Sequence, residues 1–314
     1  MTSSPATTEN WQTEAKRIAD SVRLRVLDHT LKNNGGYMSQ ACSSAETFSA
    51  LYTKIMKLGP SIAPSVPPPF PGAPSASNPN YFTGAGYNGA KSPELDRFIF
   101  SPAHYALVLY TVLIETGRMS AEGLEQFNKD GSTVEMIGAE HSPGCEVTSG
   151  SLAQALSQAA GIALARKQRG ETGRVWVYMS DGEFQEGQTW EALEVMSFYK
   201  LDNMGIYVDI NGQQCDGCMC DVMDIDPLHQ KLEAFGMRVF SVDGHDLNAL
   251  AAPAELEPDG RPLIVLAKTD PCRGLPRLQS RAPKLHYLRF TSPEEREGYA
   301  QDYVEMTAAR EGGK

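Results

Sequence analysis

Long apolar runs are missing from this 314-residue sequence. Its longest apolar stretches, such as 175–179 and 263–267, fall far short of the roughly 20 residues that a membrane-spanning helix needs. The opening residues, MTSSPATTENWQTEAKR, also contain no apolar signal core. We therefore expect no membrane partner and a cytoplasmic location.

Basic residues are scarce relative to acidic ones. The sequence has 28 Lys and Arg against 39 Asp and Glu, a formal net charge of −11. This balance opposes binding to nucleic acid or anionic lipid, so we expect no nucleic-acid partner. It does not exclude a small anionic ligand, because backbone amides and a metal ion can hold one locally.

Cysteine is also limited, with six residues in all. Without a secretory signal these are expected to be reduced thiols rather than a disulfide framework. The run CDGCMC at 215–220 contains a CxxC pair, but no second pair follows elsewhere. Because a structural zinc site normally needs four ligands, we predict that this run binds no zinc.

What the sequence does contain is an alternation of short apolar segments with helical patterns, which predicts an α/β fold. The expected architecture is doubly wound, a mainly parallel sheet with helices on both faces. The predicted strands are 98–100, 174–179, 205–210, 237–242 and 262–267. The predicted helices are 12–31, a segment from Ser43 to the stop at 59–60, 102–116, 151–169, 186–200, 226–235 and a short one from about 247.

Two segments depart from this alternation. Residues 60–90 are rich in Pro, Gly and Ser and predict a long exposed loop without regular structure. Residues 291–314 are polar and are expected to form a helical tail. We therefore expect one main domain over 1–290, which includes the loop, followed by the tail.

Polar residues follow two of the predicted strands. VWVYM leads into Ser180-Asp181-Gly182, and GIYVDI leads into Asn211-Gly212. Ligands bind at the carboxyl ends of strands in a doubly wound sheet. One carboxylate and one amide oxygen suit a magnesium ion that also holds phosphate oxygens. The alternative is that Asp181 caps the next helix and Asn211 forms a turn; the spacing alone leaves both open.

These motifs resemble the N-terminal half of transketolase. The thiamine diphosphate fingerprint of that family is Gly-Asp-Gly followed, some 25–30 residues later, by Asn. Here Asp181 and Asn211 are 30 residues apart, and the resemblance covers roughly 250 residues. The matching segments, in family order, are DRFIFSPAH at 96–104, SPGCEVTSGSLAQALSQAAGIALA at 142–165, SDGEFQEG at 180–187, DINGQQCDG at 209–217, VDGHD at 242–246 and LIVLAKT at 263–269.

The resemblance implies thiamine diphosphate and Mg2+ as cofactors. The Asp181 and Asn211 side chains and a backbone carbonyl near Gln213 would be the metal ligands. Gly182 and Glu183 would offer backbone amides to the diphosphate at a helix start, where such amides are free.

Further residues are assigned by the same resemblance. His104 would reach the diphosphate or the substrate, although alone it could equally be a surface histidine at a helix start. Ser149, Gly150 and Ser151 would lie along the cofactor, where glycine permits a close backbone approach. Glu186 would lie at the subunit boundary and take part in catalysis through it. His286 stands about where the family places a substrate-facing histidine, and His141 is a weaker candidate for another.

The sequence departs from the family pattern at several points. Ser180 replaces the first glycine of the fingerprint, which is a small change. NNGGYMSQ at 33–40 replaces the family's Gly-His-Pro-Gly segment, which puts Asn33 at the histidine position. Together with the long 60–90 loop, this predicts a nonstandard sugar substrate.

The activity implied is transfer of a two-carbon ketol unit from a ketose to an aldehyde, with sugars or sugar phosphates as substrates. Single-chain transketolases continue for two further domains, and one of them supplies the glutamate that contacts the aminopyrimidine ring. We therefore expect a partner, a C-terminal transketolase-like subunit, in a heterotetramer with two chains of each kind.

Three alternatives remain. The chain could be the thiamine-binding subunit of a 2-oxoacid dehydrogenase, a deoxyxylulose-phosphate-synthase-like protein or a noncatalytic regulatory subunit. SPGCEVTSGSL and DGHD favour transketolase over the first two. The intact Asp181, Gly182 and Asn211 argue against the third.

Overall fold

Five short apolar segments form one parallel sheet in the computed structural model, which describes residues 11–73, 75–79 and 81–312. The strand order is β1-β2-β3-β7-β6. The strands are β1 (Arg97–Phe100), β2 (Val175–Ser180), β3 (Met204–Ile210), β6 (Arg238–Asp243) and β7 (Leu263–Lys268). All neighbouring pairs are parallel, as a buried sheet with helical crossovers requires.

Side chains along each strand alternate between two hydrophobic cores. In β1, Phe98 and Phe100 belong to one core and Ile99 to the other. Because both faces are buried, β1, β2, β3 and β7 are almost continuously apolar, which is typical of parallel sheets, whereas the edge strand β6 has only partly buried or exposed residues. The doubly wound prediction is therefore confirmed.

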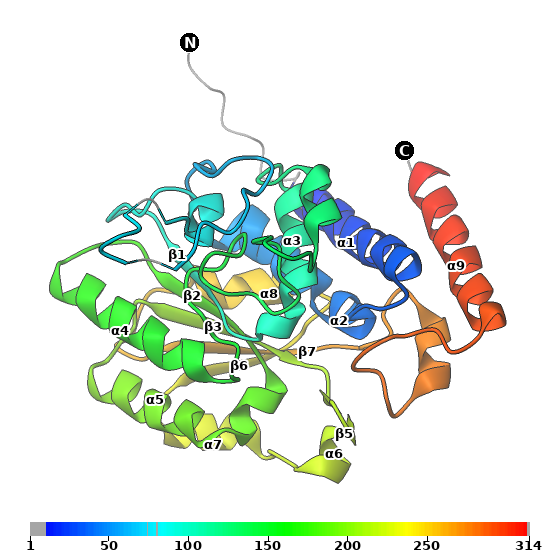
Figure 1. The fold of residues 1–314 in the computed structure, drawn as a ribbon. Coiled ribbons are helices and arrows are strands. Elements are labelled where there is room, and N and C mark those ends of the chain that lie inside the picture. Colours follow the sequence, from blue (N-terminus) through cyan, green and yellow to red (C-terminus); the bar gives the residue numbers. More distant parts are fainter. Residues whose placement is uncertain (1–10, 74, 80, 313–314) are drawn as a thin grey trace.

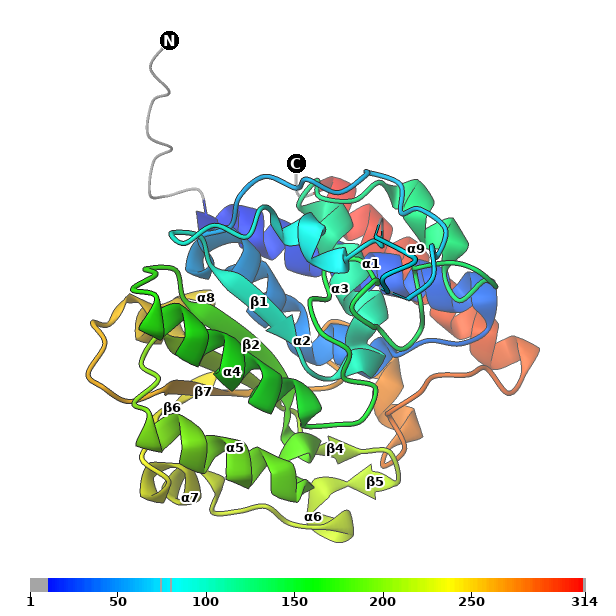
Figure 2. The same ribbon diagram turned by 60° about the vertical axis from the view of Figure 1, so that its left-hand side comes forward.

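Helices cover both faces of this sheet (Figures 1 and 2). One core contains residues of α1 (Trp11–Asn33), α2 (Met38–Ala50), α3 (Ala106–Glu115) and α8 (Leu247–Ala251). The other contains residues of α4 (Gln154–Gln168), α5 (Gly187–Phe198) and α7 (Leu228–Ala234). The expected polar tail forms α9 (Pro293–Gly312), which packs against α1 and buries Tyr299.

Short elements complete the fold. A hairpin of β4 (Gln213–Gln214) and β5 (Gly217–Cys218) leads into α6 (Met219–Val222). A π-helical turn covers Leu51–Ile55. Single 3-10 turns cover Gly84–Asn88, Ala103–Tyr105, Ala121–Gln126, Asp181–Gln185, Ala252–Glu255 and Pro276–Arg281.

Two sequence predictions need correction. The second helix begins at Met38 rather than at Ser43. Its N-cap residue, Tyr37, makes no side-chain cap, so the sequence contains no capping signal at the true start. The 60–90 segment is mostly irregular as predicted, but its end forms the 3-10 turn Gly84–Asn88 and is not exposed. Tyr87 is fully buried, and its hydroxyl donates to the Pro64 carbonyl at 2.8 Å, which ties the loop to itself. In the described part of the chain, no helix combines the length and the apolar character that crossing a membrane requires.

Candidate active site

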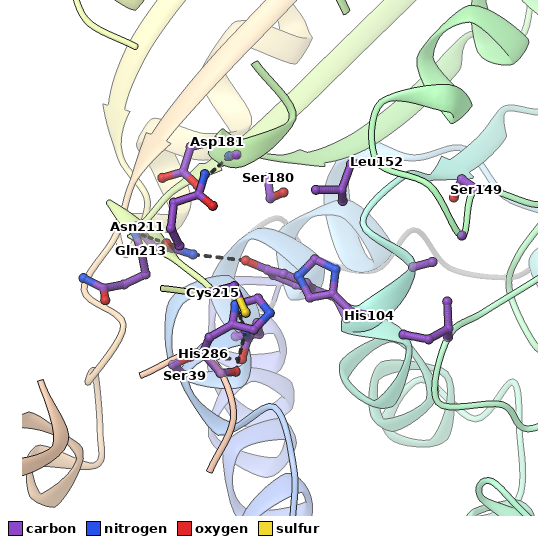
Figure 3. Close-up of a pocket in the computed structure, with 17 residues that line it drawn as sticks. Ser39, His104, Ser149, Leu152, Ser180, Asp181, Asn211, Gln213, Cys215 and His286 are labelled. Atoms are coloured by element: carbon purple, nitrogen blue, oxygen red, sulfur yellow. Dashed lines mark hydrogen bonds between the residues drawn. The ribbon is translucent and has the colours of Figure 1, made fainter. Parts of the chain in front are cut away.

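A cavity of about 260 Å³ opens beside the carboxyl ends of β2 and β3 (Figure 3). The strand register pairs Ser180 with Asp209, so the residues that follow the two strands meet at one edge of the sheet. Asp181, Gly182, Asn211 and Gln213 line the cavity on this side. His104, Ser149, Gly150 and His286 line it as well. Eight of the predicted site residues are thus brought together.

Asp181 is a buried carboxyl group, with 2% of its surface exposed. Its two oxygens accept hydrogen bonds from the backbone N–H of Gly182 at 2.9 Å and of Gly212 at 2.8 Å. Burial, and then the nearby Asp209 carboxylate, raise the pKa of Asp181 to about 8. The Gly182 amide, which the resemblance assigns to the diphosphate, is therefore engaged by Asp181 in this structure.

The Asn211 side chain is oriented by two acceptors. Its Nδ2 donates to Asp209 Oδ2 at 2.9 Å and to the Tyr105 hydroxyl at 3.0 Å. The amide oxygen must then point the other way, where it accepts the Gln213 backbone N–H at 2.8 Å. Asn211 thus presents an oxygen, not a nitrogen, on the side of Gln213.

Asp209 holds the Asn211 side chain in this orientation, and its role was not recognised from the sequence. Its carboxylate is fully buried and accepts further hydrogen bonds from Ser43, Tyr105 and Thr269 at 2.6, 3.0 and 2.6 Å. The signal was available, because a carboxylate inside the otherwise apolar strand GIYVDI needs partners. Burial raises its pKa, while these donors favour the ionised form.

Glu183 follows Asp181 in the 3-10 turn, but its carboxylate points into the protein. It accepts the backbone N–H of Ser180 at 2.8 Å and of Ala153 at 2.9 Å, and also the Ser101 hydroxyl. Ala153 adopts a left-handed conformation, with φ +68°, at the start of α4. The Glu183 side chain therefore ties the β2 end to the loop before α4.

Two neutral histidines form the other side of the cavity. The rings of His104 and His286 are 5.0 Å apart between centroids (Figure 3). Burial, and then the neighbouring His286, lower the pKa of His104 to about 3, and burial lowers that of His286. Tyr37 lies 5.5 Å from each ring.

Tyr37 changes the interpretation of the 33–40 segment. Asn33, assigned to the position of the missing family histidine, instead ends α1 and donates to the His29 carbonyl at 2.9 Å. The residue of this segment whose ring reaches the cavity histidines is Tyr37.

The loop before α4 is held by Ser149. Its hydroxyl donates to the backbone carbonyls of Phe100 at 3.2 Å and Ser101 at 2.9 Å. Gly150 is open, since a Cβ there would meet only Ile137 at 3.9 Å. Ser151 is exposed and does not line the cavity, which Leu152 lines in its place.

Other candidates lie outside the cavity. Glu186 is exposed at the start of α5. His141 lies 3.1 Å from Glu135 and is not among the lining residues. His245, in the matching VDGHD segment, accepts the Asp270 backbone N–H at 2.9 Å.

The cysteine-rich run forms the turn of the β4–β5 hairpin, strand β5 and the start of α6. Cys215 lines the cavity, whereas Cys218, Cys220 and Asp221 have ligand atoms within 4.8 Å of one another. Cys215, the first cysteine of the CxxC pair, is not part of that group. The six cysteines of the structure are free thiols.

Comparison with known proteins agrees with this geometry. Residues 85–284 match the family described as transketolase, thiamine diphosphate binding domain. The chain is 40% identical over 203 residues to a transketolase family protein of Sinorhizobium fredii, covering 63% of this chain and 72% of the relative. It is 35% identical over 198 residues to one of the subunits of an apulose-4-phosphate transketolase of Actinobacillus succinogenes, covering 62% and 71%. It is 28% identical over 261 residues to the SqwG subunit of a 6-deoxy-6-sulfo-D-fructose transketolase of a Clostridium species, covering 82% and 85%.

Solved structures show the same fold. Transketolase from Campylobacter jejuni superposes with a TM-score of 0.71 at 22% identity, covering 95% of this chain and 46% of that one. A transketolase from Pichia stipitis in complex with sedoheptulose-7-phosphate gives 0.66 at 22% identity, covering 95% and 45%. The chain thus spans less than half the length of these solved enzymes. The match over 85–284 and the cavity at the strand ends establish that this chain belongs to the transketolase family.

Proposed function

We propose that this chain is the cofactor-diphosphate-binding subunit of a two-subunit transketolase-like transferase. It would use thiamine diphosphate and Mg2+ to move a two-carbon ketol unit from a ketose to an aldehyde. The observation that carries the proposal is the meeting of Asp181, Asn211 and Gln213 at one edge of the sheet, beside two neutral histidines.

The donor set suits Mg2+. Asp181 is a buried carboxyl group without a cation beside it among the described residues, and Gln213 Oε1 is buried without a hydrogen-bond partner there. Mg2+ prefers oxygen ligands and keeps several waters and phosphate oxygens, so few protein ligands are needed. The Asp181 and Asn211 side chains and a backbone carbonyl near Gln213 would hold it.

The cavity also suits one end of thiamine diphosphate. Gly150 leaves open space beside the loop, and a Cβ on Gly182 would come within 3.0 Å of Gln214 Nε2. When bound, this cofactor supplies the nucleophilic carbon that carries the two-carbon unit between sugars. The chain's own residues hold the diphosphate end, and His104 and His286 offer neutral ring nitrogens to oxygens of the sugar.

A partner chain would complete the site. The cavity of about 260 Å³ is below the range of about 300–1,000 Å³ typical of small-molecule sites. Two of the relatives are named as subunits of transketolases. The partner would be a C-terminal transketolase-like subunit, in a heterotetramer with two chains of each kind, and the exposed Glu186 would lie near the junction. The substrate would be a nonstandard sugar or sugar phosphate, in keeping with Tyr37 beside the histidines.

Reconstitution with the partner tests the proposal. We expect no transfer from a ketose to an aldehyde by this chain alone, and transfer when the two chains are mixed with Mg2+ and thiamine diphosphate. Size measurement should then give two chains of each kind. Full turnover by the isolated chain would refute the split-enzyme assignment. Turnover of pyruvate or a branched oxoacid, without ketol transfer, would favour an oxoacid dehydrogenase subunit instead.

A further inference from the structure

The segment that carries His286 is fixed by the segment that precedes α2. Gly36 and Leu288 form an antiparallel bridge with two backbone hydrogen bonds, of 3.0 and 2.9 Å. Gly35 allows this approach, since a Cβ there would lie 2.4 Å from the Tyr287 hydroxyl oxygen. The backbone beside His286 therefore has a set position relative to the first residues of α2.

Gln40, in the first turn of α2, contacts His286 directly. It is a buried side chain, with 3% of its surface exposed. Its Nε2 donates to the His286 carbonyl at 3.0 Å and lies 3.3 Å from His286 Nδ1. The Ser39 hydroxyl donates to Gln40 Oε1 at 3.0 Å. Because a hydroxyl hydrogen and a carbonyl oxygen identify the two ends of the amide, the nitrogen end is the one at His286.

This orientation decides which imidazole nitrogen carries the proton. An amide NH2 group can only donate, so His286 Nδ1 must be an unprotonated acceptor. A neutral imidazole with an acceptor at Nδ1 carries its hydrogen on Nε2. In the described residues no hydrogen bond reaches Nε2, and His286 lines the cavity, so this N–H remains for a ligand.

The surroundings of His286 keep its ring neutral. Its ring lies against those of His104 and Tyr37, and Tyr37 in turn packs on Tyr287 at 4.9 Å between centroids. None of these rings offers a negative charge that would favour the imidazolium form, and burial disfavours it. The ring of His104, by contrast, has no hydrogen-bond partner in the described residues, so its tautomer is not fixed in this way.

We propose that Gln40 is a positioning residue that fixes His286 as a neutral Nε2–H donor toward an oxygen of the sugar substrate. The tautomer follows from contacts within this chain, whereas the role toward substrate rests on the function proposed above. Two measurements separate these parts.

The first measurement is the tautomer itself, read from the ¹⁵N chemical shifts of the imidazole nitrogens in the full chain at neutral pH. The His286 signals are identified by their loss in His286→Gln. We expect the Nε2–H form in the parent and a mixture of both tautomers in Gln40→Met. Gln40→Leu, which also replaces the amide by an apolar group, should give a mixture as well and keeps the test valid if Gln40→Met does not fold.

Gln301→Met is the matched control, because Gln301 is an exposed glutamine on α9 whose side chain donates only to Glu305 among the described residues. It should leave the His286 shifts unchanged. An Nδ1–H or doubly protonated His286 in the parent would overturn the inference. So would parental His286 shifts in folded Gln40→Met or Gln40→Leu.

The second measurement uses the enzyme assembled with its partner. Gln40→Met should lower kcat/KM by about tenfold, the effect of one misdirected hydrogen bond, while calorimetry shows unchanged binding of cofactor and Mg2+. The same change should have no effect in a His286→Ala background. An unchanged kcat/KM in Gln40→Met, or an equal loss without His286, would overturn the positioning role but not the proposed function. If the parent assembly showed no ketol transfer, the proposed function would be refuted, and the role of Gln40 toward a sugar would be refuted as well. The assignment of the His286 tautomer would be unaffected.

Discussion

Replacing Asp181 by asparagine tests the metal assignment through stability as well as through binding. Burial raises the pKa of this carboxyl group to about 8, against an ordinary value of about 3.9. Between these two values the folded, metal-free chain holds a proton that the unfolded chain releases. The unfolded state therefore binds fewer protons, and the free energy of unfolding falls as the pH rises from about 4 to about 8.

The size of this effect can be worked out. Each pH unit between the two pKa values costs roughly 1.4 kcal/mol, or about 5 kcal/mol at pH 7.5. Asparagine has no such cost. Its NH2 group, however, cannot accept one of the backbone N–H groups of Gly182 and Gly212, which costs about 1–3 kcal/mol. Without metal, Asp181→Asn should be more stable than the parent by about 2–4 kcal/mol at pH 7.5 and less stable at pH 4.

Urea unfolding measures both sides of this prediction. Curves are recorded at pH 4 and pH 7.5 with a chelator, and again at pH 7.5 with Mg2+ and thiamine diphosphate. A ligand that binds only the folded state stabilises it by mass action, so the parent should gain stability and the variant should not. Asp130→Asn, at an exposed aspartate distant in the sequence from Asp181, is the charge-matched control. Its free energy of unfolding should change with pH and ligand as that of the parent does.

Two results would refute the reasoning. If Asp181→Asn were less stable than the parent at both pH values, the carboxyl group would not be carrying a proton in the folded chain. If Mg2+ and cofactor stabilised the variant as much as the parent, Asp181 would not be a metal ligand.

Three other changes have expected outcomes. Asn211→Ala should abolish ketol transfer by the assembled enzyme while leaving the circular dichroism spectrum unchanged, because it removes a ligand oxygen; calorimetry showing parental binding of Mg2+ and cofactor would contradict this. Glu183→Ala should lower the free energy of unfolding by about 3 kcal/mol, because it leaves buried donors, among them two backbone N–H groups and the Ser101 hydroxyl, without an acceptor, whereas Glu186→Ala should change it by less than about 0.5 kcal/mol in the same urea assay. The cysteines at 215–220 should be reduced and free of metal. Metal analysis of protein purified without chelator should therefore find no zinc, and one zinc per chain would show that this prediction is wrong.

The layered fold was predictable because both faces of the sheet are buried. That burial makes four of the strands short apolar runs, and the predicted strands agree with all five observed strands within about two residues. Shorter elements gave no such signal. The β4–β5 hairpin has two-residue strands, too few to show a period, and α2 begins at Met38 after a residue that makes no side-chain cap.

From the strand pattern alone the site was predictable only at the strand ends, whereas His104, Ser149, Gly150 and His286 were predicted from the family resemblance. Asp181 and Asn211 follow directly from the rule that parallel strands present their carboxyl ends at one edge. Gln40 and Tyr37 could not be found in this way, because their roles depend on a bridge between Gly36 and Leu288, which are distant in the sequence. Asp209 lay between the two cases, since its burial in β3 was predictable but its partners were not.

Three buried carboxyl groups at the cavity differ in their hydrogen-bond donors, and this difference supports placing the proposed cation at Asp181. Asp209 accepts from four side-chain donors, and Glu183 accepts from two backbone N–H groups and the Ser101 hydroxyl. Asp181 has no side-chain donor at all among the described residues and is the only one of the three that lines the cavity. A carboxylate has about four lone-pair positions, so Asp181 keeps positions free on the cavity side. Asp209 does not line the cavity, but it influences the same proposed metal site indirectly. It accepts a hydrogen bond from the Asn211 nitrogen and thereby leaves the Asn211 oxygen for a ligand.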